Sequence, residues 1–176
     1  AAVLNTYAVI ERFHPDLVIS AGTAGGWRRA DGEIGDVYVS DQHVVHHDRR
    51  IDLPGFADYG IGRYPVVSLR NMAAQLGLKI GVVTTGNSLD ESESDRRMIL
   101  TSGAVVKDME AASVAYVCHQ MSVPFVAVKA ITDLVDDHTS TAEQFNANLV
   151  MASRRLSEEL LRVLDWVIPR DLAELD

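Results

Sequence analysis

The chain has 176 residues, of which 47% are hydrophobic and 23% are charged, as in folded globular proteins with a sizeable core. Its formal net charge of −9 argues against nucleic acid or an anionic membrane surface as the main partner. Cys118 is the single cysteine, which excludes an internal disulfide and is typical of a reducing compartment, so we expect a cytoplasmic protein.

Helical patterns and runs rich in Val and Ile alternate along the chain. In chain order, we expect a helix at 1–13, strands at 17–22 and 36–45, a helix at 66–76, a strand at 79–86, a helix at 94–101, a strand at 104–109, a helix at 110–121, a strand at 124–133 and a helix at 141–165.

Continuous rather than alternating hydrophobicity in the strands indicates burial on both faces. We therefore predict one α/β domain over residues 1–176, a mostly parallel twisted central sheet with helices on both faces. Thr141 is expected to cap the last helix. The chain opens in a helical pattern with no leading strand, so we also expect an N-terminal truncation.

Polar residues and glycines follow four of the expected strands, at "AGTAGG" (21–26), "TTGNS" (84–88), "KDME" (107–110) and "TD" (132–133). Ligands of open α/β sheets bind at the carboxyl ends of strands, so these segments predict one site. Structural roles remain open for each of them. The glycines suit a turn with positive φ, Asp108 and Asp133 suit caps, and Glu110 suits the first turn of a helix.

The run "HVVHHD" supplies His43, His46, His47 and Asp48, a set that raises the question of a metal site. On a strand His43 and His46 point to opposite faces, which favours a polar surface or subunit contact, and we expect no metal. No Ser/His/Asp or Cys/His arrangement appears in a recognisable local context. The remaining carboxylates suit acid–base chemistry on a neutral small molecule that bears hydroxyls.

Four segments between Val18 and Phe145, "ISAGTAGG", "TTGNSLDES", "VVKDMEAASVAYVCHQMSVPFVAVKAITDLVDD" and "TAEQF", resemble the nucleoside phosphorylase/hydrolase superfamily. Within it they most resemble 5′-methylthioadenosine/S-adenosylhomocysteine nucleosidases. The resemblance implies a homodimer without cofactor or metal that hydrolyses the N-glycosidic bond of a small-molecule purine nucleoside and releases adenine. Leu89 and the "HDRRI" run resemble the plant-type enzymes, which favours methylthioadenosine over adenosylhomocysteine.

The resemblance also implies roles for single residues. Glu110 would bind the ribose 2′- and 3′-hydroxyls, and Asp133 would act as general acid toward N7 of the purine, with its pKa raised by burial. The implied substrate-binding residues are Thr23, Ala24 and Gly25 on the ribose and water side, Asp108 and Met109 beside Glu110, Leu89 and the backbone near Asp90 at the adenine, and Phe145 over the base. Segment 46–60, with Leu53, Phe56 and Tyr59, would cover the 5′-alkylthio group of the nucleoside bound by the partner subunit. The alternative is that this segment is an ordinary surface loop.

The sequence also departs from the family pattern. Asn87 stands where the family commonly has Asp, Lys129 where some members have Arg, and the family's water-positioning Glu has no match in this sequence. The loop "LVDDHTST" after Asp133 carries two acids and no Arg, so we expect water rather than phosphate as the nucleophile. The alternatives are a purine nucleoside phosphorylase and a catalytically impaired nucleoside-binding fragment.

Overall fold

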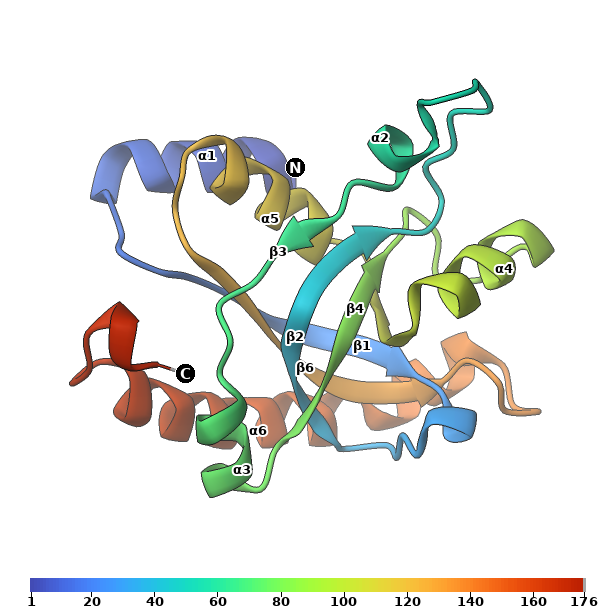
Figure 1. Cartoon of the computed structure of the whole chain (residues 1–176). Coiled ribbons are helices and arrows are strands. Elements are labelled where there is room, and N and C mark those ends of the chain that lie inside the picture. The colour runs from blue at the N-terminus through green and yellow to red at the C-terminus, as the bar shows by residue number, and fades with distance from the viewer. Residues whose placement is uncertain (176) are drawn as a thin grey trace.

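The structure is a computed structural model that describes residues 1–175, except for the side chain of Ala57. Six strands and six α-helices follow one another in the described part of the chain (Figure 1). They are α1 (Ala2–Phe13), β1 (Val18–Gly26), β2 (Val37–His46), α2 (Ala57–Ile61), β3 (Tyr64–Pro65), α3 (Arg70–Leu76), β4 (Lys79–Thr85), α4 (Glu93–Ser102), β5 (Ala104–Asp108), α5 (Ala111–Gln120), β6 (Phe125–Leu134) and α6 (Thr141–Val167).

The six strands form one mixed sheet in the order β3-β2-β4-β5-β1-β6. The pairs β1–β6, β2–β4 and β4–β5 are parallel, whereas β2–β3, β1–β5 and β2–β6 are antiparallel. The β2–β6 pair joins distant positions of this order and curls the sheet into a barrel-like closure, which covers strand edges that an open sheet would expose. The expected mostly parallel sheet is therefore not confirmed, although the α/β class is.

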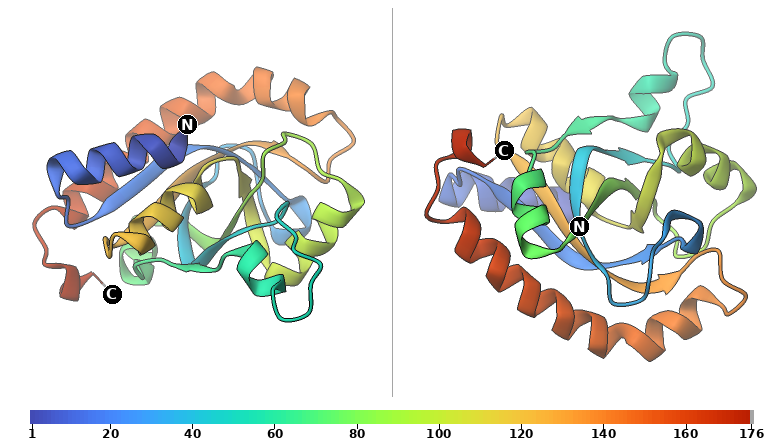
Figure 2. Two further views of the ribbon diagram at one scale, coloured as in Figure 1. Left: turned by 90° about the horizontal axis from the view of Figure 1, so that it is seen from above. Right: turned by 60° about the horizontal axis from the view of Figure 1, so that its bottom comes forward.

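Helices cover the sheet on opposite sides, as expected (Figures 1 and 2). One side packs α5 against the sheet through residues such as Ala112, Val83 and Val106, and α1 lies over α5. On the other side, the long α6 runs along β6 and β1. None of the helices in residues 1–175 is both long and apolar enough to cross a lipid bilayer.

The short elements α2 and β3 were not predicted, and three predicted elements differ from the structure at an end or in a cap. The glycine segment 21–26 continues β1 instead of forming a loop after it. Residues 66–69 precede α3 and are not helical, and Val67 N donates to Phe125 O at 2.8 Å, so packing beside β6 overrides the helical pattern. Ser140 rather than Thr141 caps α6, because its hydroxyl accepts from the backbone N of Glu143 at 3.3 Å.

Candidate functional site

A cavity of about 210 Å³ opens at the carboxyl ends of β1, β5 and β6. It joins segments that are distant in the sequence, as a site at strand ends should. Its lining residues are Thr23, Ala24, Gly25, Leu89, Lys107, Asp108, Met109, Glu110, Thr132, Asp133 and Phe145. All predicted catalytic and substrate-binding residues thus meet here except Asp90, which lies outside the lining.

Gly25 is at the centre of the arrangement because it pairs with Lys107 of β5 on one side and with Asp133 of β6 on the other. A Cβ at this position would lie 2.8 Å from Oδ2 of Asp133 and 3.0 Å from Cγ2 of Val135. Gly25 does not have a positive φ. The glycine is therefore required for the close approach of a carboxyl group and not for a turn.

The register between β1 and β6 slips by one residue beside Gly25. Ala24 pairs with Ile131, but Gly25 pairs with Asp133, so Thr132 is the extra residue of a bulge. Side chains alternate between the faces of a strand, so without the bulge Asp133 would point to the opposite face. The bulge thus aims the Asp133 carboxyl into the cavity.

Asp133 is the most deeply buried carboxyl group that points into the cavity, with 2% of the residue exposed. Its Oδ1 accepts a hydrogen bond from the Thr132 hydroxyl at 2.7 Å. Burial raises the pKa of Asp133, while the Thr132 hydroxyl and the positive charge of Lys107 act in the opposite direction. The direction agrees with the expectation from the sequence and favours a carboxyl group that can donate a proton.

Asp108 lines the cavity, but its carboxylate is occupied by the protein itself. Oδ1 accepts from the Thr85 hydroxyl at 2.5 Å, and Oδ2 accepts from the backbone N of Ala111 at 2.9 Å. The same Oδ2 forms a buried ion pair with Nζ of Lys129 at 2.7 Å. Glu110 rather than Asp108 is the N-cap residue of α5, but the bond from Ala111 lets Asp108 hold the start of this helix. The ion pair gives the buried Lys129 a partner.

Met109 and Glu110 follow Asp108 at the mouth of the cavity, just before α5. The Met109 side chain is partly exposed, and the Glu110 side chain makes no capping hydrogen bond. Both are thus positioned to contact a ligand, unlike Asp108.

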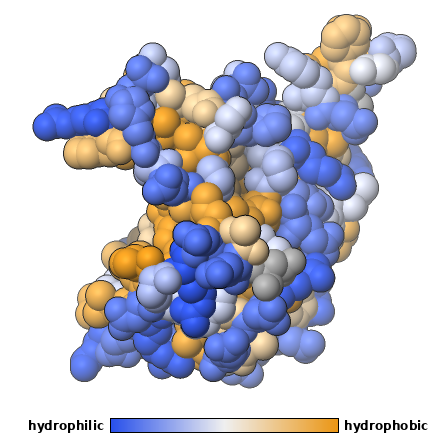
Figure 3. All heavy atoms as spheres, turned by 60° about the vertical axis from the view of Figure 1, so that its left-hand side comes forward, coloured by the Kyte–Doolittle hydropathy of each residue, from blue (hydrophilic) through white to orange (hydrophobic). Residues whose placement is uncertain are grey.

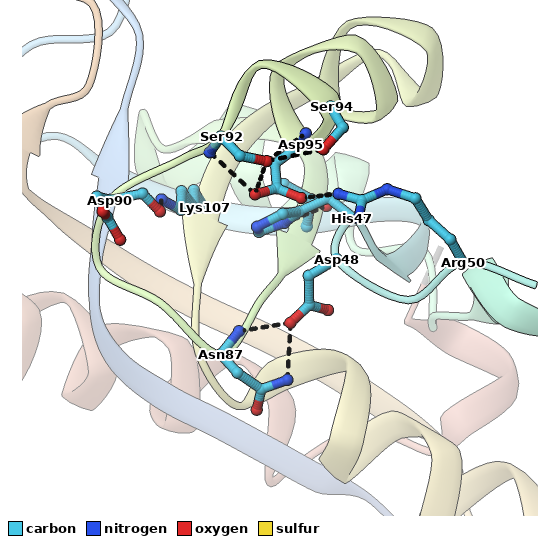
Figure 4. A network of polar contacts seen from close by, with 10 residues as sticks. His47, Asp48, Arg50, Asn87, Asp90, Ser92, Ser94, Asp95 and Lys107 are labelled. Carbon is cyan, nitrogen blue, oxygen red and sulfur yellow. Dashed lines mark hydrogen bonds and ion pairs between the residues drawn. The ribbon is translucent and has the colours of Figure 1, made fainter.

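Lys107 lines the same cavity and was not among the residues selected from the sequence. It is 5% exposed, and burial lowers its pKa. Its Nζ donates to Leu89 O at 2.8 Å. It also donates to Asp90 O at 2.7 Å, and Figure 4 shows Lys107 beside Asp90. A lysine inside the apolar run "AVVK" was the available signal, because a buried charge requires specific partners.

The histidine-rich segment does not join the cavity lining. His47 is buried with Nδ1 3.1 Å from the Thr84 hydroxyl, and the ring of His46 meets that of Tyr64 edge-on. Within residues 1–175 no group of three or more His, Cys, Asp or Glu side chains is arranged to hold a metal ion.

The predicted partner loop projects from the molecule around α2 (Figure 1). Leu53, Phe56 and Tyr59 are 59%, 55% and 75% exposed, which is high for large apolar side chains. They lie outside the cavity lining of this chain.

A larger hollow of about 350 Å³ lies elsewhere, between α5 and the segment around 65–67. The face that carries it is hollowed and lined with apolar side chains, as Figure 3 shows. Its lining includes Val66, Val123 and Phe125 but no carboxylate, so this hollow lacks the acids that the expected chemistry requires.

Residues 1–165 match the family model of the phosphorylase superfamily. The chain is 44% identical over 175 residues to a 5′-methylthioadenosine nucleosidase of Arabidopsis thaliana, covering 99% of this chain and 65% of the relative. It is 42% identical over 174 residues to a 5′-methylthioadenosine/S-adenosylhomocysteine nucleosidase of the same plant, covering 99% of this chain and 68% of the relative. The chain thus spans about two thirds of the length of these relatives.

Solved structures show the same similarity in three dimensions. The apo form of Arabidopsis thaliana 5′-methylthioadenosine nucleosidase superposes with a TM-score of 0.95 at 42% identity, covering 98% of this chain and 70% of that one. A nucleosidase from Colwellia psychrerythraea in complex with adenine gives a TM-score of 0.76 at 26% identity, covering 93% of this chain and 72% of that one.

Proposed function

Because the chain belongs to the 5′-methylthioadenosine/S-adenosylhomocysteine nucleosidase family of the phosphorylase superfamily, we propose that it hydrolyses the N-glycosidic bond of 5′-methylthioadenosine. The products are adenine and the 5-methylthioribose, and S-adenosylhomocysteine is a second, bulkier substrate. The preference for methylthioadenosine is supported by the 44% identity to a plant relative that carries this name.

One observation carries the proposal. Asp133, a buried carboxyl group with a raised pKa, shares a cavity with Met109 and with Glu110, whose side chain makes no capping hydrogen bond. The protonated Asp133 donates to N7 of the purine as the bond between C1′ and N9 breaks. The electron pair of that bond leaves with the base. Glu110 binds the two ribose hydroxyls and stabilises the positive charge that develops on the sugar. Water then adds to C1′ and releases a proton to solvent, and the Asp133 carboxylate takes up a proton from solvent before the next cycle.

Water is the nucleophile that this cavity favours over phosphate. Among its described lining residues Lys107 is the single cation, its Nζ is bound to two carbonyls, and no arginine is present. The two acids that follow Asp133 lie outside this lining. Asp136 accepts from the backbone N of Arg28 at 2.8 Å, and Asp137 pairs with the Arg28 side chain at 2.7 Å, so Arg28 binds both acids.

The other residues have supporting roles in the proposal. Thr23 and Ala24 line the ribose side, Leu89 and Phe145 enclose the base, and the backbone near Asp90 reads its edge. Asp108 acts indirectly, since it holds the start of α5 and thereby Glu110. A homodimer would bring Leu53, Phe56 and Tyr59 to the 5′ end of the partner's ligand.

The test is release of adenine from methylthioadenosine by this chain, with and without phosphate. Release that does not depend on phosphate supports hydrolysis. Release that requires phosphate would establish a phosphorylase, and binding of the nucleoside without any release would establish a binding protein.

A further inference from the structure

Lys107 is a buried charged residue for which the chemistry above has no role. Its ammonium group donates to two successive carbonyls, those of Leu89 and Asp90, in the segment that connects β4 to α4. Hydrogen bonds from a charged donor are stronger than neutral ones, and here they fix backbone rather than another side chain.

The segment that Lys107 holds is tied at both ends by other contacts (Figure 4). At its start, Asp48 Oδ2 accepts from the backbone N of Asn87 at 2.8 Å and from Nδ2 of Asn87 at 2.7 Å. At its end, Ser92 and Asp95 form a capping box for α4. Between these ties Leu89 lines the cavity, and the two bonds from Lys107 fix the backbone at that point.

Lys107 and Asp133 lie on either side of β1, with Gly25 between them. Both residues pair with Gly25, one on each side, and residues paired in one row point to the same face. Gly25 has no side chain, so no side chain of the intervening strand separates the two. We propose that Lys107 is a positioning residue, which holds the Leu89–Asp90 backbone against the purine and acts across Gly25 on the carboxyl group of Asp133.

The charges around this pair define the electrostatics. Four negative charges act on Lys107, those of Asp90 and Glu91 in the loop, Asp95 in α4 and Asp133. The charge of Lys107 in turn helps to lower the pKa of His47, which follows β2. From the cavity side, Asp133 shares its surroundings with Asp108 and Glu110. Lys107 is the cation that acts on Asp133, and its charge lowers the pKa of this carboxyl group. Removal of the charge therefore raises that pKa, and Asp133 stays protonated to higher pH.

Three variants of the full chain separate the two effects. Lys107→Met removes both the donor and the charge, Lys107→Gln keeps an uncharged donor, and Lys107→Arg keeps both. Each is measured by amide hydrogen exchange over residues 87–91, by calorimetric titration with adenine, and by NMR titration of the Asp133 carboxyl carbon.

For Lys107→Met we expect exchange of the loop amides and the Kd for adenine each to rise about tenfold or more, because a charged hydrogen-bond donor is lost. The Asp133 carboxyl should titrate at higher pH in both Lys107→Met and Lys107→Gln, whereas Lys107→Arg should resemble the wild type. If Lys107→Met does not fold, Lys107→Gln provides the same titration comparison.

Unchanged loop exchange and adenine affinity in Lys107→Met would overturn the positioning role. An unchanged Asp133 titration in Lys107→Gln would overturn the action across Gly25. The inference rests on the proposed function, but exchange and carboxyl titration need no turnover. A wild-type chain that neither binds adenine nor cleaves nucleoside would refute the proposed function, while these two measurements still decide the role of Lys107.

Discussion

Asp133 is the residue on which the proposed chemistry depends most directly. In Asp133→Asn the side chain keeps its size but cannot transfer a proton to N7, so we expect kcat to fall by about 10²–10⁴-fold. Adenine affinity and the urea midpoint should change little. A suitable control is Asp136→Asn, since Asp136 contacts Arg28 and Arg29 outside the cavity and this variant should keep its turnover. Full turnover in Asp133→Asn would remove Asp133 from the mechanism.

Gly25 sets the position of the same carboxyl group. In Gly25→Ala the added methyl group would meet Oδ2 of Asp133 at 2.8 Å, so the carboxyl group must move. Small displacements of a catalytic group are costly, and we expect kcat to fall by about 10²-fold with a smaller change in KM. Gly22→Ala, on the same strand, places its methyl group 3.4 Å from Lys129 Nζ and should lose much less. Equal losses in the two variants would contradict this explanation.

The sequence predicted the residues of the cavity better than their individual contacts. Asp133 and Glu110 were selected because acids at strand ends are unusual and match a family pattern. Lys107 was not predicted, because a lysine next to Asp108 in the sequence resembles an ordinary surface residue. The pairing of β5 with β1 places it at the cavity. Asp90 lies outside the lining, and Leu89 is the neighbouring residue that lines the cavity.

Among the elements, β5 and β6 are joined by the buried pair of Asp108 and Lys129. In Asp108→Asn the ammonium group stays buried without a carboxylate, so we expect the free energy of unfolding to fall by about 3 kcal/mol. The double variant Asp108→Asn with Lys129→Met removes both charges and should be more stable than Asp108→Asn alone. Urea unfolding of the two variants measures the difference, and a double variant less stable than the single one would contradict this account.

The longer elements were predicted better than their ends, and the short α2 and β3 were not predicted. Three glycines in "AGTAGG" suggested a loop, yet β1 continues to Gly26 because ladder bonds to β6 outweigh the local preference of glycine for turns. The bulge at Thr132 is equally invisible in the sequence, since it depends on the register of two strands about a hundred residues apart. Periodicity identifies a strand but not its neighbour.

For the whole molecule, the exposed apolar loop predicts association. Replacement of Leu53, Phe56 and Tyr59 by serine should convert a dimer into monomers and raise KM, as measured by light scattering and kinetics. Leu161 and Ile168 are 64% and 75% exposed on or beside α6, and their replacement by serine should leave the mass unchanged. A wild-type chain that is already monomeric would show that segment 46–60 is an ordinary surface loop.

The pairing of β2 with β6 connects Val37–Val39 to Val128–Ala130 and closes the sheet. Contacts between such distant segments form slowly, because the entropy of loop closure must be overcome first. The strands that bear Gly25, Lys107 and Asp133 belong to this same closed sheet, so no smaller folded part of the chain contains the cavity. On heating, catalytic competence and secondary structure should therefore disappear in one cooperative transition. Nascent chains that end before β6 should have neither catalytic competence nor this secondary structure.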